Sequence, residues 1–268
     1  MSRIDKRFAD LKAQGRTGLI PFVTAGDPLP HAMVALMHAL VAAGADLIEL
    51  GVPFSDPMAD GPVIQHASER ALARGVGLKQ IFGWVREFRS RDANTPVVLM
   101  GYMNPVEIHG AALFAREAVG AGVDGVLLVD CPIEEIDAAA PLRDAGLAQI
   151  FLAAPTTAGD RLARICVAAQ GFLYYVSFAG ITGAERLELD TVRERVIGIK
   201  QQARTPVAVG FGVRDAVSAA AIGGFADAVV IGSALVDRLA GAQDARDACA
   251  RARDFLAPIR AALDAHGG

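Results

Sequence analysis

Several features that would indicate other classes of protein are scarce or missing in this chain. Only three cysteines occur among 268 residues, Cys131, Cys166 and Cys249. They are too few and too widely spaced for a disulfide framework or a CxxC metal site, and they fit a reducing compartment. No apolar run is long enough to span a membrane, and the N-terminal segment holds no apolar stretch typical of a secretion signal. We therefore expect a cytoplasmic protein.

An excess of charge of one sign is also lacking. The formal net charge is −4 and charged residues make up 21% of the chain, so there is no basic surface for nucleic acid or for a membrane. Hydrophobic residues make up 53%, enough for the core of one large domain or two small ones. A small molecule is the expected ligand.

Apolar segments of strand length recur along the whole chain, separated by segments with helical spacing. Eight strands are expected, at Leu19–Thr24, Leu47–Gly51, Val97–Tyr102, Gly125–Asp130, Gln149–Ala153, Phe172–Ser177, Val207–Phe211 and Ala228–Gly232. Alternation of strand and helix indicates parallel strands joined by right-handed crossovers. Eight such units favour a closed (β/α)8 TIM barrel over the alternative, an open doubly wound sheet.

The N-terminal segment has a helical pattern of its own. Ile4, Phe8 and Leu11 share one face of a helix, so we expect an extra N-terminal helix that caps the bottom of the barrel. No linker or low-complexity stretch divides the chain. Residues 1–268 are therefore expected to form a single TIM-barrel domain.

Further absences narrow the chemistry. Lysine occurs only at Lys6, Lys12, Lys79 and Lys200, never at the C-terminal end of an expected strand, so an imine-forming aldolase lacks its nucleophile. The histidines are not paired at strand ends, so no metal site is expected. No GxGxxG motif follows the first strand, which argues against a dinucleotide. Carboxylates and tyrosines remain as the groups that can transfer protons.

The segment DLIELGVPFSDPMADGPVIQ, residues 46–65, is the most informative part of the chain. Glu49 lies within a short apolar strand, and Asp56 and Asp60 follow in a turn rich in proline and glycine. A barrel strand is covered on both faces, and a buried carboxylate there costs several kcal/mol unless it is paired or protonated. The segment therefore indicates an active-site edge, with a purely structural acid as the alternative reading of Glu49.

Two glycine turns indicate a phosphate site. Gly210 and Gly212 follow the seventh strand, and Gly232 follows the eighth, with Ser233 placed as a helix N-cap. Loops after strands seven and eight of barrels often hold phosphate, and the alternative is that these glycines serve only tight turns. A third loop, Phe178 to Glu185, has glycines on both sides of Thr182 and is interpreted as a lid, or otherwise as a merely mobile loop.

Six segments of the chain together resemble the α-subunit of tryptophan synthase over essentially the whole length. They are LIPFVTAGDP at 19–28, ELGVPFSDPMADGP at 49–62, MGYMNP at 100–105, DCPIEE at 130–135, GITG at 180–183 and GFG at 210–212. The second is highly specific for the family. The resemblance implies a lyase that performs the retro-aldol cleavage of indole-3-glycerol phosphate to indole and glyceraldehyde 3-phosphate, in the last steps of L-tryptophan biosynthesis.

The resemblance also implies roles for individual residues. Glu49 would be the general acid and base, with a pKa near neutrality, and Asp60 would accept the indole N–H and remain ionised in a polar loop. Met100 and Ala153 stand where bulkier or branched residues are expected. The substrate would contact Phe22, Met100, Tyr102, Leu127, Val129, Ala153, Tyr175, Thr182 and Val230. Its phosphate would lie against Gly183, Phe211, Gly212, Gly232 and Ser233.

The family further implies a partner. A β-subunit that carries pyridoxal phosphate would receive the indole within an αββα heterotetramer, and this chain itself would need neither cofactor nor metal. The expected interface comprises Pro53, Asp56, Met58, Asn104, Pro105, Asp130, Cys131, Pro132, Glu134 and Glu135. The alternatives are a free-standing lyase with the same chemistry and a non-catalytic barrel that activates a partner, the second of which is disfavoured by the intact acids.

Overall fold

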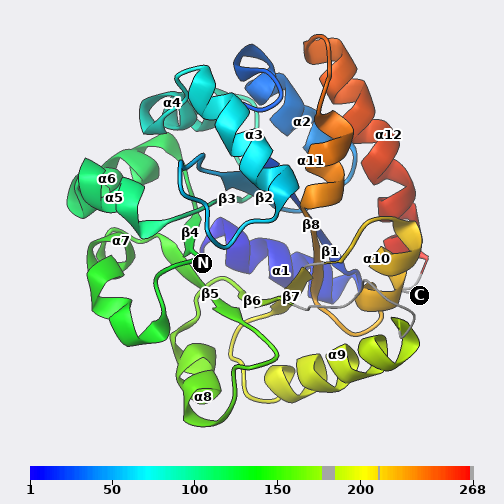
Figure 1. Ribbon diagram of the computed structural model, residues 1–268. Coiled ribbons are helices and arrows are strands. Elements are labelled where there is room, and N and C mark those ends of the chain that lie inside the picture. Colours follow the sequence, from blue (N-terminus) through cyan, green and yellow to red (C-terminus); the bar gives the residue numbers. More distant parts are fainter. Residues whose placement is uncertain (177–184, 211, 266–268) are drawn as a thin grey trace.

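The computed structural model describes residues 1–176, 185–210 and 212–265, with the backbone alone for residues 185–188. Within these ranges, eight parallel strands form a closed barrel in which β1 pairs with both β2 and β8 (Figure 1). The strands are Gly18–Thr24 (β1), Ile48–Gly51 (β2), Val97–Gly101 (β3), Gly125–Leu128 (β4), Ala148–Ala153 (β5), Leu173–Val176 (β6), Val207–Gly210 (β7) and Ala228–Ile231 (β8). The predicted barrel is confirmed, and every strand overlaps the segment expected for it.

Helices surround the barrel on its outer side (Figure 1). They are α1 (Arg3–Ala13), η1 (Pro30–Ala32), α2 (Met33–Ala42), α3 (Pro62–Ala73), α4 (Leu78–Arg89), α5 (Met103–His109), α6 (Ala111–Ala121), η2 (Ile133–Ala139), α7 (Ala140–Asp144), α8 (Gly159–Ala168), α9 (Glu185–Lys200), α10 (Ala216–Gly223), α11 (Ser233–Leu239) and α12 (Ala245–Asp264). Helix α5 was not expected from the sequence. No helix in the described ranges is both long and apolar enough to cross a membrane.

Side chains along the strands alternate between two hydrophobic clusters, as the period of a strand requires. The first cluster fills the barrel interior and includes Ile20, Leu47, Val98, Leu127, Ile150, Phe172, Tyr174, Ala208 and Val230, with Met100, Val129, Leu152 and Val176 packed against it. The second lies between the strands and the helices and includes Leu19, Ile48, Leu99, Val126, Ala153, Leu173, Tyr175, Val209 and Val229. Cluster membership therefore tells which strand side chains can reach a ligand in the barrel.

Helix α1 closes one end of the barrel. Its residues Ile4, Phe8 and Leu11 belong to the interior cluster, and the rings of Phe8 and Phe172 lie 5.9 Å apart between centroids. The helix is seen at the centre of Figure 1, crossing the barrel axis. The expected N-terminal cap is thus confirmed, and a binding site must open at the opposite end, where the strands terminate.

Carboxylates fix the strands at the end that α1 closes. Asp46, Asp124 and Asp227 come shortly before β2, β4 and β8, and each accepts a hydrogen bond from a backbone N–H of the preceding strand. These bonds join Asp46 to Leu19 at 3.0 Å, Asp124 to Val97 at 2.8 Å and Asp227 to Val207 at 2.8 Å. Each carboxylate is also paired with a base, namely Arg260, Arg89 and Lys200 respectively. Charges at this end of the barrel are therefore paired.

Candidate active site

Glu49 is enclosed inside the barrel. It lies on β2, it is 0% exposed, and neither carboxyl oxygen has a hydrogen-bond partner among the residues that the structure describes. Burial disfavours the charged form and raises the pKa of this carboxyl to about 8. The direction is the one expected from the apolar strand, and the group is a proton donor at neutral pH.

Two aromatic side chains define the space around Glu49. Phe22 pairs in register with Glu49, and its ring covers Gly51, where an added Cβ would lie 2.5 Å from the ring. Tyr174 enters from β6, and its pKa is raised well above the usual value by burial and further by the charge of Glu49. A Cβ at Gly210 would overlap the Tyr174 hydroxyl, so both glycines make room for aromatic rings.

Asp60 is held at the mouth of the barrel by Tyr102. The Tyr102 hydroxyl donates to Asp60 Oδ2 at 3.0 Å and accepts from the backbone N–H of Ala59 at 3.0 Å. Burial raises the pKa of the half-buried Asp60 carboxyl, whereas the bond from Tyr102 lowers it. The loop is therefore less polar than expected from the sequence, and the Tyr102 hydroxyl is the group that stabilises the ionised form.

The glycine turns lie where the sequence places them, after β7 and β8. Gly212 has a φ of +81°, a conformation that favours glycine. Gly232 is the N-cap of α11 and Ser233 is its first residue, which corrects the expectation that Ser233 is itself the cap. The expected phosphate residues Gly183 and Phe211, together with Thr182 and the expected lid loop at 178–184, lie outside the described residues.

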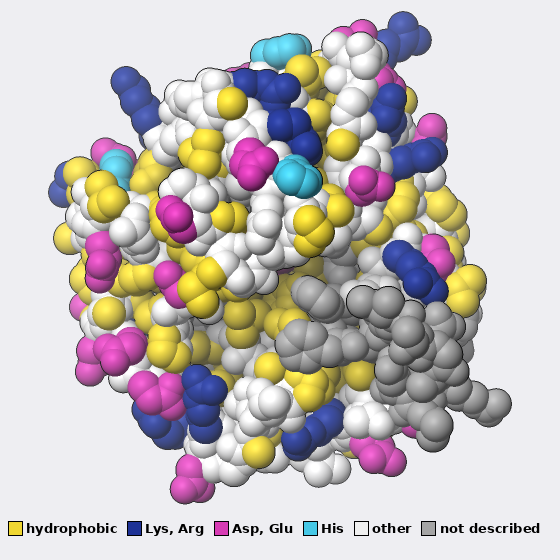
Figure 2. Space-filling view, in the orientation of Figure 1, with side chains coloured by type: hydrophobic (Ala, Val, Ile, Leu, Met, Phe, Trp, Pro, Cys, Tyr) yellow, Lys and Arg dark blue, Asp and Glu magenta, His cyan; other side chains and the backbone are white. Residues whose placement is uncertain are grey.

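Most expected members of the indole pocket face the barrel interior. Leu127 and Val230 belong to the interior cluster, Met100 and Val129 pack against it, and Met100 also packs against a small cluster that contains Phe22. Tyr102 continues from β3 and reaches Asp60. Apolar side chains are visible at the centre of this face in Figure 2. These positions form an apolar wall beside the two acids.

Ala153 and Tyr175 do not face the interior, and the prediction that they line the pocket is wrong. Both side chains belong to the outer cluster between strands and helices. Their neighbours Leu152 and Tyr174 face the interior instead. The strands β5 and β6 are apolar on both faces, so hydrophobicity alone could not assign the facing; counting alternate residues from a confirmed interior position would have found it.

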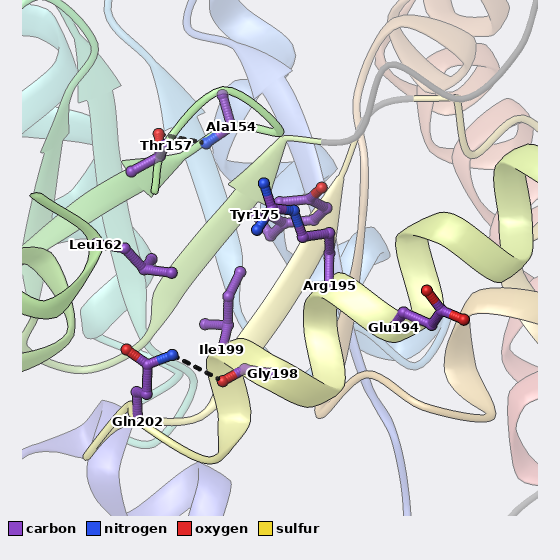
Figure 3. Close-up of a pocket in the computed structure, with 9 residues that line it drawn as sticks. All are labelled: Ala154, Thr157, Leu162, Tyr175, Glu194, Arg195, Gly198, Ile199 and Gln202. Atoms are coloured by element: carbon purple, nitrogen blue, oxygen red, sulfur yellow. Dashed lines mark hydrogen bonds between the residues drawn. The ribbon is translucent and has the colours of Figure 1, made fainter. Parts of the chain in front are cut away.

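Figure 3 shows where Tyr175 lies. Its ring is beside the Arg195 side chain of α9, in a cavity of about 120 Å³ on the outer side of β5 and β6. Arg195 Nη2 donates to the carbonyl oxygen of Pro155 at 2.9 Å. This cavity is separated from the acids by the barrel wall, because Glu49 and Tyr175 lie in different layers.

The residues expected at a partner interface lie mostly at the surface. Asp56, Met58, Asn104, Asp130, Pro132, Glu134 and Glu135 are exposed, and Pro105 is half-buried. Pro53 and Cys131 are buried, and Cys131 Sγ lies 3.6 Å from the carbonyl oxygen of Glu135. Burial also raises the pKa of the Cys131 thiol. These two residues therefore support the rim from beneath and offer no surface of their own.

Metal-ligating side chains do not gather in this site. Among the residues that the structure describes, no group of three or more His, Cys, Asp or Glu side chains could hold a metal ion. The groups that this site offers for chemistry are two carboxyl groups, two tyrosines and an apolar wall.

Comparisons with known proteins agree on one family. The model of the tryptophan synthase alpha chain family matches residues 8–263. The chain is 61% identical to a tryptophan synthase alpha chain of Xylella fastidiosa (strain 9a5c) over 266 residues, covering 99% of each chain. It is 61% identical to one of Xanthomonas oryzae pv. oryzae over 267 residues, covering 98% of this chain and 99% of the relative.

Solved structures give the same result. The tryptophan synthase subunit alpha of Legionella pneumophila str. Paris superposes with a TM-score of 0.92 at 44% identity, covering 99% of each chain. An open form of tryptophan synthase from M. tuberculosis superposes with a TM-score of 0.86 at 36% identity, covering 98% of this chain and 99% of that one.

The raised pKa of Glu49 makes stability depend on pH. The folded protein holds this proton up to about pH 8, whereas the unfolded chain releases it near 4.5. The stabilising contribution is complete below the unfolded pKa and is lost as pH rises through the folded pKa, by at most about 1.4 kcal/mol per pH unit. Urea unfolding of wild type and Glu49→Gln should therefore show a difference in free energy that shifts in favour of the variant between about pH 5 and about pH 8.

The control for this measurement is Glu87→Gln, which removes an exposed carboxyl of α4. Its difference from wild type should stay flat across the same range. A flat difference for Glu49→Gln as well would show that the buried carboxyl is not protonated in the folded state.

Proposed function

The chain belongs to the tryptophan synthase alpha chain family, and on that premise we propose how its own residues perform the reaction. It is a lyase that cleaves indole-3-glycerol phosphate, one half-reaction of tryptophan synthase. The observation that carries the proposal is the carboxyl of Glu49 inside an apolar barrel, which is fully buried, has no hydrogen-bond partner among the described residues, and has a pKa raised by burial to about 8. One domain over residues 1–268 performs this reaction.

Glu49 supplies and recovers one proton. Its carboxyl group protonates C3 of the indole ring, which places a positive charge on the ring and its nitrogen. The resulting carboxylate then takes the proton of the glycerol hydroxyl next to the ring. The bond between C3 and the glycerol carbon breaks, its electron pair returns to the ring, and indole and the aldehyde of glyceraldehyde 3-phosphate leave. General acid and base assistance of this kind contributes about 10²–10⁴ in rate.

Asp60 stabilises the charge that forms during protonation. Its carboxylate accepts a hydrogen bond from the indole N–H. The Tyr102 hydroxyl donates a hydrogen bond to Oδ2 of the same carboxyl group and holds it in place. The wall against the indole ring is formed by apolar and aromatic side chains that face the barrel interior, namely Phe22, Met100, Leu127, Val129, Val230, Leu152 and Tyr174. Gly212, Gly232 and Ser233, with Gly183 and Phe211, hold the phosphate, because backbone N–H groups at a helix start and at glycine turns favour an anion.

A β-subunit is the proposed partner of this lyase, in a cytoplasmic αββα heterotetramer. The exposed Met58 and Ile108 support this assignment, since their side chains are 84% and 80% exposed and apolar residues this exposed are typical of binding surfaces when they lie together. Met58 lies in the loop after β2, and Ile108 lies in helix α5, which follows the neighbouring strand β3. The pyridoxal phosphate belongs to that partner, and this chain uses no cofactor of its own.

Glu49→Gln should abolish cleavage while leaving the fold intact. The amide is isosteric but cannot donate a proton to carbon, so the loss should be at least about 10²-fold. Indole release from indole-3-glycerol phosphate measures cleavage, and calorimetry with glycerol 3-phosphate measures phosphate binding, which should be retained. Glu87→Gln serves as the control. Turnover at the wild-type level in Glu49→Gln would remove Glu49 from the mechanism.

Asp60→Asn should slow the chemical step and spare binding. Losing one electrostatic stabiliser of the transition state typically costs about 3 kcal/mol, or roughly 10²-fold in rate. Single-turnover cleavage at saturating substrate separates the chemical step from binding. Asp56→Asn, an exposed neighbour in the same loop, is the control in the isolated chain. An unchanged single-turnover rate would contradict the role of Asp60.

Mixing the chain with a tryptophan synthase β-subunit should give a complex in sedimentation velocity and a higher cleavage rate. Met58→Asp should weaken the complex by about tenfold or more, because a charge is placed in an apolar contact. Val217→Asp is the matched control, since Val217 is 79% exposed on α10. Absence of both complex and activation would identify a free-standing lyase instead.

A further inference from the structure

Helix α3 is attached directly to Asp60. Gly61 is the N-cap of the helix and Pro62 is its first residue. Gln65, in the first turn, donates from Nε2 to the carbonyl oxygen of Asp60 at 2.8 Å, and its backbone N–H donates to Gly61 at 3.0 Å. The peptide of Asp60 is therefore bonded to the first turn of α3, and a shift of the helix moves the carboxyl with it.

The buried face of α3 consists of small residues. Its buried residues are Ala67, Ser68 and Ala71, and the helix packs against α11 and β1. In the first turn, Val63 and Ile64 are partly buried and pack against the cluster that contains Phe22. Small side chains form shallow ridges, so they give weak resistance to sliding or rotation of a helix. Beyond the first turn, the position of α3 therefore depends on contacts other than apolar packing.

A fork, that is an ion pair with two parallel hydrogen bonds, supplies a further constraint on the position of α3. Arg70 donates from Nε to Asp27 Oδ1 at 2.7 Å and from Nη2 to Asp27 Oδ2 at 2.9 Å. The Asp27 side chain is 2% exposed, and its backbone N–H donates to the carbonyl oxygen of Thr24 at the end of β1 at 3.1 Å. Two parallel bonds fix direction as well as distance. The ion pair therefore fixes the position of helix α3 relative to the barrel wall.

We propose that Arg70 is a positioning residue for Asp60: its fork on Asp27 fixes α3 against the end of β1, and Gln65 transmits that position to the Asp60 peptide. The inference rests on the proposed role of Asp60 in cleavage. Arg70 touches no substrate, and it acts by keeping Asp60 beside Tyr102 and aimed at the indole nitrogen. Displacement of a charge-stabilising group by about 1 Å is enough to reduce a rate by about 10²-fold.

Arg70→Met and Arg70→Lys test the assignment. Kcat per folded molecule should fall by about 10- to 100-fold in Arg70→Met, with KM changed by less than about threefold, because the apolar wall and the phosphate site stay in place. Arg70→Lys should recover only part of the loss, since an ammonium group cannot form the fork. The folded fraction is measured by circular dichroism, so that simple loss of stability does not count as loss of kcat.

The chain offers two matched controls. Arg251 has the same side-chain exposure as Arg70, 36%, and bonds Asp247 at 2.9 Å on α12, so Arg251→Met should leave kcat unchanged. Arg74 lies on α3 and faces the same carboxylate, but its Nη1 is 3.8 Å from Asp27. Arg74→Met should cost less than about threefold in kcat, because no hydrogen bond at that distance fixes direction.

A double-mutant cycle with Asp60→Asn separates positioning from other effects. If Arg70 acts through Asp60, Arg70→Met should lower the single-turnover rate by less than about twofold in the Asp60→Asn background. Additive losses, or a wild-type kcat in folded Arg70→Met, would overturn the assignment. Should Arg70→Met not fold, Asp27→Asn replaces it, because the amide keeps its size and one acceptor. Unchanged turnover in Asp60→Asn itself would instead refute the proposed function.

Discussion

A buried carboxyl group in the barrel interior is the constraint on which the rest of the site depends. Glu49 is fully buried and accepts no hydrogen bond from the described part of the chain, so its charged form is costly and its proton is retained. Two parts of the fold maintain that environment. Helix α1 closes the far end with Ile4, Phe8 and Leu11, and the rings of Phe22 and Tyr174 occupy the space that Gly51 and Gly210 leave open. The acidity of the site is therefore a property of the closed barrel rather than of a local motif.

The carboxyl groups at the two ends of the barrel differ in whether they are paired. At the end beside α1, Asp46, Asp124 and Asp227 each receive a backbone N–H and a basic side chain. At the other end, within the described ranges, Glu49 has neither and the Asp60 carboxyl has one tyrosine hydroxyl. Paired acids hold strands together and have no proton to give, whereas an unpaired acid is destabilising but reactive. The barrel places stability and chemistry at different ends, as its architecture allows.

The barrel and the position of Glu49 could be predicted from the sequence. Each parallel strand is a separate apolar segment, and Glu49 indicated which side chains of β2 point into the barrel. The facing of β5 and β6 could not be predicted, since Ile150 to Ala153 and Phe172 to Tyr175 are apolar or aromatic at every position and two adjacent tyrosines give no preference. Helix α5 was not predicted; it is seven residues long and has Pro105 in its first turn, a position that tolerates proline. The fork between Arg70 and Asp27 joins residues 43 positions apart, so no local pattern could indicate it.

The two acids differ in how firmly the fold holds them, and this difference bears on how a partner could control the reaction. The backbone of Glu49 is part of a strand paired on both sides, so this backbone moves only with the barrel. Asp60 is in a loop that also contains Phe54, whose ring lies 5.1 Å from the ring of Tyr102 between centroids. Tyr102 in turn bonds Asp60 and Ala59. In the proposed complex, a β-subunit seated on Asp56 and Met58 would press on the same loop. It would therefore adjust Asp60 through Phe54 and Tyr102 while the backbone of Glu49 stays in place, so that the position of one acid would govern a reaction that needs both.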